Sequence, residues 1–271
     1  MDLAFLQAKS RGLRRDTLSC IASIGIGHVG GALSIIDILT VLYYGVMKVE
    51  PKNPKMEGRD RLVLSKGHGG PALYSVLADK EYFPKSELET LNRLGTNLPS
   101  HCDMLRTPGI DMTAGSLGQG FSCAVGIAVG SKIKKEDACV YAIIGDGESQ
   151  EGIIWEAAMY AAHKKLDNLI AFCDLNLYQI DGAVEDVNSL GDIKAKWESF
   201  GWKVQEVDGH DHMAILGAIE NAKTIKGCPH MILARTVKGK GVSFIEQAGA
   251  TNHNMPITKE QLQAALAELA G

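Results

Sequence analysis

The sequence lacks several features that would assign it to a particular class of protein. None of its six cysteines stands in a Cys-x-x-Cys pair, so neither a zinc ribbon nor a disulfide scaffold is indicated. Cys139 and Cys173 fall within apolar runs, where a thiol acts as a small hydrophobic group. The amino terminus lacks the basic start and apolar centre of a signal peptide, and we find no apolar stretch that approaches the length of a membrane span. We therefore expect a cytoplasmic protein that does not associate with membranes.

An excess of charge of either sign is also absent. The chain carries 28 Lys and Arg residues against 32 Asp and Glu residues, and its formal net charge is −4. Because the basic residues are scattered, nothing suggests a nucleic-acid partner. No internal repeat, low-complexity segment or linker divides the chain, and 45% of its residues are hydrophobic, as in a globular enzyme. We expect residues 1–271 to form a single domain.

Helical and strand patterns alternate along the sequence. The predicted strands cover residues 61–64, 138–144, 168–173, 203–207 and 230–236. Helices are predicted over residues 3–24, 34–46, 71–78, 86–94, 117–133, 150–165, 193–200 and 212–225, with a terminal helix that begins at Thr258. Ser34 followed by Asp37 resembles a capping box at the start of the second helix. This alternation predicts an α/β fold with a mostly parallel sheet covered by helices on both faces.

Asp146 and Asn176 each follow an apolar run that is predicted to be a buried strand. Asp146 lies between Gly145 and Gly147, and a helical pattern separates the two strands. In a strand–helix–strand unit the carboxyl ends of the strands are neighbours, so the carboxylate and the amide oxygen can converge on one cation. Hard oxygen ligands combined with phosphate oxygens suit Mg²⁺. The alternative is an ordinary turn at Gly145–Gly147 and a loop asparagine.

Four of the eight histidines lie in loops where a ligand could approach. His28 and His68 are next to glycines, and His101 and His253 also lie in predicted loops. Taken singly, each is more typical of a surface histidine. The other four, His163, His210, His212 and His230, fall at the ends of helices or strands, and we interpret them as structural.

Two common cofactor classes find no motif here. No His-x-x-x-His pair is predicted on a helix, which argues against zinc. The loop Gly115–Gly120 lacks the Gly-x-Gly-x-x-Gly order and a preceding strand, which argues against a nicotinamide cofactor.

Five ordered segments together resemble the amino-terminal, diphosphate-binding part of transketolase. They are Gly27-His28-Val29-Gly30-Gly31, Asp60-Arg61-Leu62-Val63-Leu64-Ser65-Lys66-Gly67-His68, the loop Gly115–Gly120, the segment Gly145–Gly152, and Lys238-Gly239-Lys240-Gly241. The resemblance extends over nearly the whole chain. It implies the thiamine diphosphate-binding fold and an enzyme of carbohydrate metabolism, as in the pentose phosphate pathway, that uses thiamine diphosphate and Mg²⁺.

The resemblance also implies a role for each matching residue. Those expected to hold Mg²⁺ are Asp146, Asn176 and the carbonyl of Tyr178. Those expected near the cofactor are His68 and Gly147 at the diphosphate, Gly115, Ser116 and Leu117 at the aminopyrimidine, and Lys66 and Lys238. Those expected to serve catalysis are His28, His101 and His253 around the sugar, and Glu151, which links to the glutamate that activates the cofactor. The family usually has Trp-His-Gly where this chain has Asn252-His253-Asn254, which makes His253 the weakest match.

Transketolases transfer a two-carbon ketol unit from a ketose to an aldose, and in the family a second, pyrimidine-binding domain supplies the activating glutamate. This sequence ends at Gly271, where that domain would follow. The resemblance therefore implies a split enzyme that is active only with a carboxyl-terminal partner chain, in a heterotetramer of two copies of each, acting on sugars or sugar phosphates. The alternatives are an α subunit of a 2-oxoacid dehydrogenase, which shares the Gly145–Asn176 element but not the histidine turns, and a non-catalytic thiamine diphosphate-binding protein.

Overall fold

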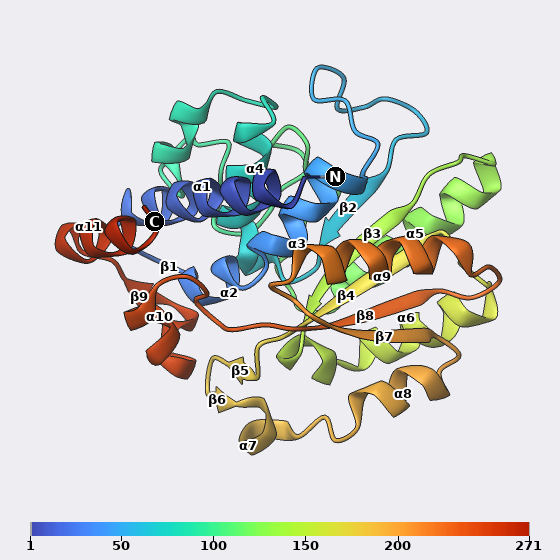
Figure 1. Cartoon of the computed structure of the whole chain (residues 1–271). Coiled ribbons are helices and arrows are strands. Elements are labelled where there is room, and N and C mark those ends of the chain that lie inside the picture. The colour runs from blue at the N-terminus through green and yellow to red at the C-terminus, as the bar shows by residue number, and fades with distance from the viewer. Residues whose placement is uncertain (1, 271) are drawn as a thin grey trace.

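A five-stranded parallel sheet forms the centre of the molecule (Figure 1). The computed structural model describes residues 2–270, so Met1 and Gly271 lie outside the described residues. The strand order is β2-β3-β4-β8-β7, and every neighbouring pair is parallel. The bounds are β2 Arg61–Leu64, β3 Val140–Gly145, β4 Leu169–Leu175, β7 Lys203–Asp208 and β8 His230–Arg235. Two small antiparallel pairs lie outside this sheet, β1 Ile26–Gly27 with β9 Met255–Pro256 and β5 Tyr178–Gln179 with β6 Gly182–Ala183.

Helices cover both faces of the sheet, and the fold predicted from the sequence is confirmed. The bounds are α1 Leu3–Ala22, α2 Val29–Leu33, α3 Ile36–Val41, α4 Gly70–Asp79, α5 Gln119–Lys134, α6 Gly152–His163, α7 Val184–Asn188, α8 Ile193–Ser199, α9 His212–Thr224, α10 Ser243–Gln247 and α11 Lys259–Glu268. A π-helical turn covers Leu42–Val46, and 3₁₀ turns cover Gly67–Gly69, Lys85–Thr90, Gly147–Gln150 and Gly249–His253. In Figure 1, α1 and α9 lie above the strands and α8 lies below them.

Alternation along the strands divides the interior into two cores. Tyr141 and Ile143 of β3 pack with α1, α3, α4 and α9, whereas Val140, Ala142 and Ile144 pack with α5, α6 and α8. Successive side chains of a strand point to opposite faces, so a run that is apolar throughout needs helices on both sides. This is why the apolar runs of the sequence became central strands.

The structure corrects two predicted helices. The stretch predicted as one helix over 34–46 is divided into α3 and a π-helical turn, and α2 already begins at Val29 within the expected break. Ser34 caps no helix, because its hydroxyl donates to Asp174 Oδ2 at 2.7 Å. The predicted helix over 86–94 is only the 3₁₀ turn Lys85–Thr90. The expected cap of the terminal helix is correct, since Thr258 and Gln261 form a capping box.

One stretch also contradicts the sequence-based expectation about apolar length. Val29–Val46 is long and apolar enough to cross a membrane by length and composition, with a mean hydropathy of 1.7. In this fold 83% of that window is buried. Its single charged residue, Asp37, is paired with Arg14 of α1. A buried core segment meets the same criteria of length and composition as a membrane span, so the stretch is accounted for by the interior of the fold.

Candidate functional site

A cavity of about 300 Å³ opens at the carboxyl edge of the sheet. Loops that follow β2, β3, β4 and β8 meet there, which is where open α/β sheets bind ligands. Every residue predicted for the site lines this cavity except Ser116: His28, Lys66, His68, His101, Gly115, Leu117, Asp146, Gly147, Glu151, Asn176, Tyr178, Lys238 and His253. Ser116 lines an adjoining cavity together with Gly115 and His101. The structure thus brings together residues that are spread over most of the sequence.

Asp146 links the ends of two neighbouring strands. It follows β3, and its carboxylate accepts hydrogen bonds from the backbone N–H of Gly147 at 2.8 Å and of Leu177, beyond β4, at 2.5 Å. The residue is only 3% exposed. Burial, and then the negative charge of Asp174, raise the pKa of Asp146 to about 6. The carboxylate therefore sits where additional positive charge would stabilise it.

The amide of Asn176 has a fixed orientation. Its Nδ2 donates to Asp174 Oδ2 at 2.8 Å, so the other amide atom, the oxygen Oδ1, is the one that accepts, from the N–H of Tyr178 at 3.2 Å. The carbonyl of Tyr178 in turn accepts from Lys238 Nζ at 2.8 Å. A carbonyl or amide oxygen has two lone pairs, so each of these two oxygens keeps one for a further partner.

These donors can be tested for their fit to a metal. Among residues 2–270 no group of three or more His, Cys, Asp or Glu side chains could hold one, which speaks against a soft or all-protein site. Asp146, Asn176 and the Tyr178 carbonyl provide one carboxylate and two neutral oxygens, all hard ligands. Such a set suits Mg²⁺ that shares its other positions with phosphate oxygens or water. The residues fit, and their assignment stays a prediction.

Asp174 organises the site, although no sequence pattern had singled it out. It is the sixth residue of β4 and is 0% exposed. Its carboxylate accepts from Lys66 Nζ at 2.5 Å, from Ser34 Oγ at 2.7 Å, from Asn176 and from the hydroxyl of Thr236. Burial alone would raise its pKa, but the charge of Lys66 and these hydrogen bonds hold the pKa of Asp174 below its usual value. A carboxylate two residues before Asn176, in an otherwise apolar strand, was the signal that could have revealed it.

Glu148 was missed as well, and it fixes the glycine loop that follows residue 114. Its carboxylate accepts from the backbone N–H of Gly118 at 2.8 Å, from that of Gly145 at 3.0 Å and from the hydroxyl of Ser65. Gly118 has φ +80°, and a Cβ there would lie 2.4 Å from Ile153 Cγ2. Only glycine meets both requirements, which explains part of the glycine content of this loop.

Four imidazole rings gather in the cavity. The ring of His28 lies 5.4 Å from those of His101 and His253 and 5.6 Å from that of His68, measured between centroids. Burial lowers the pKa of all four, to about 4 for His28 and about 3 for His253, with nearby positive charge adding to the effect at His28, His68 and His253. The rings are therefore neutral at neutral pH, and each can donate one hydrogen bond and accept another.

Two lysines give the cavity its positive charge. Lys66 is 1% exposed and is balanced by Asp174. Lys238 Nζ lies 3.2 Å from His253 Nδ1, and burial, followed by the charge of Lys66, lowers the pKa of Lys238 to about 8. Ammonium and imidazole N–H groups that face one cavity favour an anionic ligand.

The rim of the cavity remains open toward Glu151. This residue precedes α6 and is exposed, and its side chain makes no capping hydrogen bond. Apolar side chains stand in the open nearby, with Leu117 37%, Leu177 58% and Ile180 64% exposed. Gly147 is closely covered, since a Cβ there would lie 3.0 Å from Gln179 Cβ. Lone apolar residues on a surface are common, but a group of them beside a cavity marks a contact surface.

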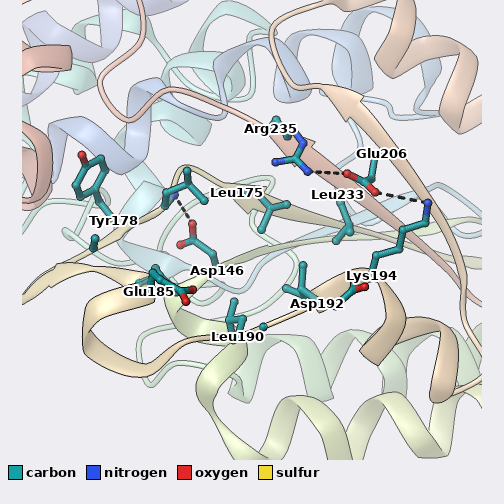
Figure 2. A pocket seen from close by; sticks show the side chains of 15 residues that line it. Asp146, Leu175, Tyr178, Glu185, Leu190, Asp192, Lys194, Glu206, Leu233 and Arg235 are labelled. Carbon is teal, nitrogen blue, oxygen red and sulfur yellow. Dashed lines mark hydrogen bonds and ion pairs between the residues drawn. The ribbon is translucent and has the colours of Figure 1, made fainter.

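A second, larger cavity of about 510 Å³ shares Asp146 with the first (Figure 2). Figure 2 shows that its charged side chains pair with one another: Glu206 contacts Arg235 at 2.9 Å and Lys194 at 3.5 Å. No histidine or cysteine stands among the described residues that line it. The groups suited to chemistry therefore concentrate in the first cavity.

The histidines interpreted as structural lie outside the first cavity. His163 is exposed at the end of α6, and His230 Nε2 lies 3.1 Å from the carbonyl oxygen of Ile225. His210 and His212 contact Asp37 at the far side of α3.

Comparison with known proteins gives one consistent result. Residues 7–270 match the family model described as transketolase, thiamine diphosphate binding domain. A 6-deoxy-6-sulfo-D-fructose transketolase subunit (SqwG) from a Clostridium species is 56% identical over 97% of this chain and 96% of its own length. One of the two subunits of an apulose-4-phosphate transketolase from Phocaeicola vulgatus is 38% identical over 100% of this chain and 95% of its own length. A solved transketolase from Campylobacter jejuni superimposes with a TM-score of 0.93 at 33% identity, and this chain covers 43% of that longer chain.

Proposed function

The chain belongs to the transketolase family, in its thiamine diphosphate-binding domain, and we propose that it is the N-terminal subunit of a two-chain transketolase. The reaction is transfer of a two-carbon ketol unit from a ketose to an aldose. The observation that carries the proposal is the first cavity, in which Asp146, Asn176, two lysines and four neutral imidazoles face one space. We also place the chain in the cytoplasm and treat residues 1–271 as one domain.

Thiamine diphosphate fits the cavity with its anionic end inward. Asp146, Asn176 and the Tyr178 carbonyl would hold Mg²⁺, and His68, Lys238 and the backbone at Gly147 would bind the diphosphate. Bound thiamine diphosphate supplies a thiazolium carbon that acts as nucleophile and electron sink. Asp174 supports this arrangement from below, because it fixes both Lys66 and the amide of Asn176.

Neutral imidazoles suit the handling of a sugar. His28, with His101 and His253 at 5.4 Å, can bind sugar hydroxyls as donor and acceptor and can exchange a proton with them. General acid–base catalysis requires a group that gains and loses a proton during the reaction, and a buried neutral histidine can do both. His253, which departs from the usual family context, is assigned the same role on the strength of its place beside Lys238.

A partner chain completes the active site in this proposal. The similar proteins from Clostridium and Phocaeicola are named as subunits, and solved transketolase chains are more than twice as long as this one. The partner would supply the pyrimidine-binding domain, with its activating glutamate opposite Glu151, and would cover Leu117, Leu177 and Ile180 at the open rim. The proposed assembly is a heterotetramer of two copies of each chain.

The ketose we favour carries an anionic group at its far end. The relative at 56% identity is named for 6-deoxy-6-sulfo-D-fructose, and the one at 38% for apulose 4-phosphate. The difference in identity favours the sulfonated sugar as donor. Sugar phosphates of the pentose phosphate pathway are the further candidates.

The test is reconstitution from purified chains. We expect no ketol transfer by this chain alone or by the partner alone, and transfer when both are mixed with thiamine diphosphate and Mg²⁺. The donors to compare are 6-deoxy-6-sulfo-D-fructose, fructose 6-phosphate and xylulose 5-phosphate, with kcat/KM highest for the first. Robust turnover by the single chain would refute the split site, and oxidative decarboxylation of a 2-oxoacid without ketol transfer would refute the reaction class.

A further inference from the structure

A second group of buried polar side chains lies outside the cavity and is centred on Asp37. Arg14 of α1 binds both carboxylate oxygens, at 3.0 and 2.5 Å, and His210 Nδ1 lies 2.8 Å from Oδ2. His212 Nε2 is 3.3 Å from Oδ1. The side chains of Asp37 and Arg14 are 3% and 8% exposed. A fully paired ion cluster in the interior needs a reason, because desolvation offsets much of its Coulomb energy.

Hydroxyl groups fix the tautomer of His212. Thr40 donates to the carbonyl of Ile36 at 2.7 Å, and Ser10 donates to Thr40 at 3.0 Å. Ser10 has then used its only proton, so it must accept from His212 Nε2, which lies 2.7 Å away. His212 therefore carries its proton on Nε2 and serves the packing of α1, α3 and α9.

His210 faces a different structure, the segment after β8. Its Nε2 accepts the backbone N–H of Val237 at 2.9 Å, so this nitrogen carries no proton and Nδ1–H donates to Asp37. Arg14 Nε reaches the same segment, where it donates to the carbonyl of Lys240 at 3.0 Å. Asp37 thus orients two side chains that bind the backbone on either side of Lys238.

The remaining contacts of this segment run into the cavity. The N–H of Gly239 donates to the carbonyl of Gly30 at 3.0 Å, and the carbonyl of Lys238 accepts from Asn252 Nδ2 at 3.0 Å. Gly241, with φ +97°, packs against Arg14, since a Cβ there would lie 3.0 Å from Arg14 Cδ. Lys238 Nζ then reaches Tyr178 and His253 across the cavity. Each step from Asp37 to this ammonium group is a direct hydrogen bond or a short length of chain.

We propose that His210, oriented by Asp37 and assisted by Arg14, is a positioning residue that fixes the backbone of Val237–Gly241 and so places Lys238 in the cavity. His210 touches neither the cavity nor any residue proposed to bind the metal. Its effect on catalysis rests on the proposed function, through Lys238. Its effect on the backbone does not depend on that function.

The experiment compares His210→Ala with His210→Gln, whose side-chain oxygen can take the place of Nε2, and with His163→Ala as the control on an exposed histidine. Amide hydrogen exchange is measured on the full chain without partner. We expect exchange at Val237 to rise about tenfold in His210→Ala, the factor given by loss of one hydrogen bond, and to return toward wild type in His210→Gln. β3 and β4 and the control variant should remain as protected as in the wild type.

Kinetics of the reconstituted complex give the second measurement. His210→Ala should lower kcat/KM at least tenfold and weaken thiamine diphosphate binding, and His210→Gln should recover most of both. Unchanged exchange at Val237 in His210→Ala, or a rise that His210→Gln does not reduce, would overturn the inference. An inactive wild-type complex would instead refute the proposed function, because the exchange comparison needs no activity.

Discussion

Replacing Asp174 by asparagine removes one charge from the interior while it keeps the shape of the side chain. Lys66, at 1% exposure and 2.5 Å from the carboxylate, would lose its counter-charge. Breaking a buried ion pair from one side costs roughly 3–5 kcal/mol, since the remaining charge stays desolvated. Lost hydrogen bonds to Ser34 and Thr236 add about 0.5–1.5 kcal/mol each. The uncompensated charge is therefore the largest contribution.

The expected loss is large against the total stability of a domain, about 5–15 kcal/mol. At about 2–4 °C for each kcal/mol, the charge contribution corresponds to a fall in Tm of roughly 6–20 °C. Urea unfolding of the purified chain measures the free energy directly, and scanning calorimetry measures Tm. The matched control is Lys66→Met, alone and combined with Asp174→Asn.

The double variant separates charge from shape. Without Lys66 the interior holds no unpaired ammonium, so the double variant should be more stable than the sum of the single losses predicts, with a coupling energy of about 2–3 kcal/mol. Its affinity for thiamine diphosphate should nevertheless remain low, because Asn176 has lost the acceptor that orients its amide. A loss below about 1 kcal/mol for Asp174→Asn, or a double variant with no positive coupling, would show that the Lys66 charge does not depend on Asp174.

Three further predictions concern the same cavity. Asp146→Ala should abolish Mg²⁺-dependent binding of thiamine diphosphate in calorimetric titration, and retention of both metal dependence and affinity would remove Asp146 from the metal site. Gly30→Ala should destabilise the chain by about 1–3 kcal/mol, because its Cβ would lie 2.1 Å from Asn252 Oδ1, whereas Gly126→Ala, which meets nothing within 4 Å, should be neutral or stabilising by up to about 1 kcal/mol; equal effects of the two would contradict the packing argument. The histidines of the cavity should make the chain acid-sensitive: the folded-state pKa values of His28 and His253, about 4 and about 3, lie below the ordinary 6.5, so the unfolded chain takes up protons first and the stability that is present above pH 6.5 is lost as the pH falls toward 4 and below. His28→Asn with His253→Asn should flatten that dependence in urea titrations, and an unchanged slope would mean that these rings are not neutral in the folded chain.

Local sequence signals were enough to predict the sheet and the convergence of Asp146 with Asn176. Apolar runs bounded by glycine marked β3 and β4, and the carboxyl ends of neighbouring parallel strands must meet. The turns around His28 and His68 could be selected only through their resemblance to a known family. Their convergence in one cavity follows from the way β2 and α2 pack, which periodicity does not encode.

What could not be predicted depends on contacts between distant parts of the chain. Ser34 has the local pattern of a helix cap, but its hydroxyl is taken by Asp174, 140 positions away. The same buried carboxylate, together with Glu148, is one of two acidic residues whose importance appears only when loops from different strands are seen together. Asp37 behaves alike: within an apolar stretch it is an exception, and its partners lie on α1 and beyond β7.

Locating the bound metal would decide whether Asp146 and Asn176 form the cofactor site. Crystals of this chain, with its partner, thiamine diphosphate and Mn²⁺ in place of Mg²⁺, would show the metal by its anomalous scattering. We expect a single strong peak at about 2.1 Å from oxygens of Asp146, Asn176 and the Tyr178 carbonyl, with diphosphate oxygens completing the octahedron. A peak elsewhere, or a diphosphate bound outside the cavity that His28, His68 and Lys238 line, would contradict this assignment.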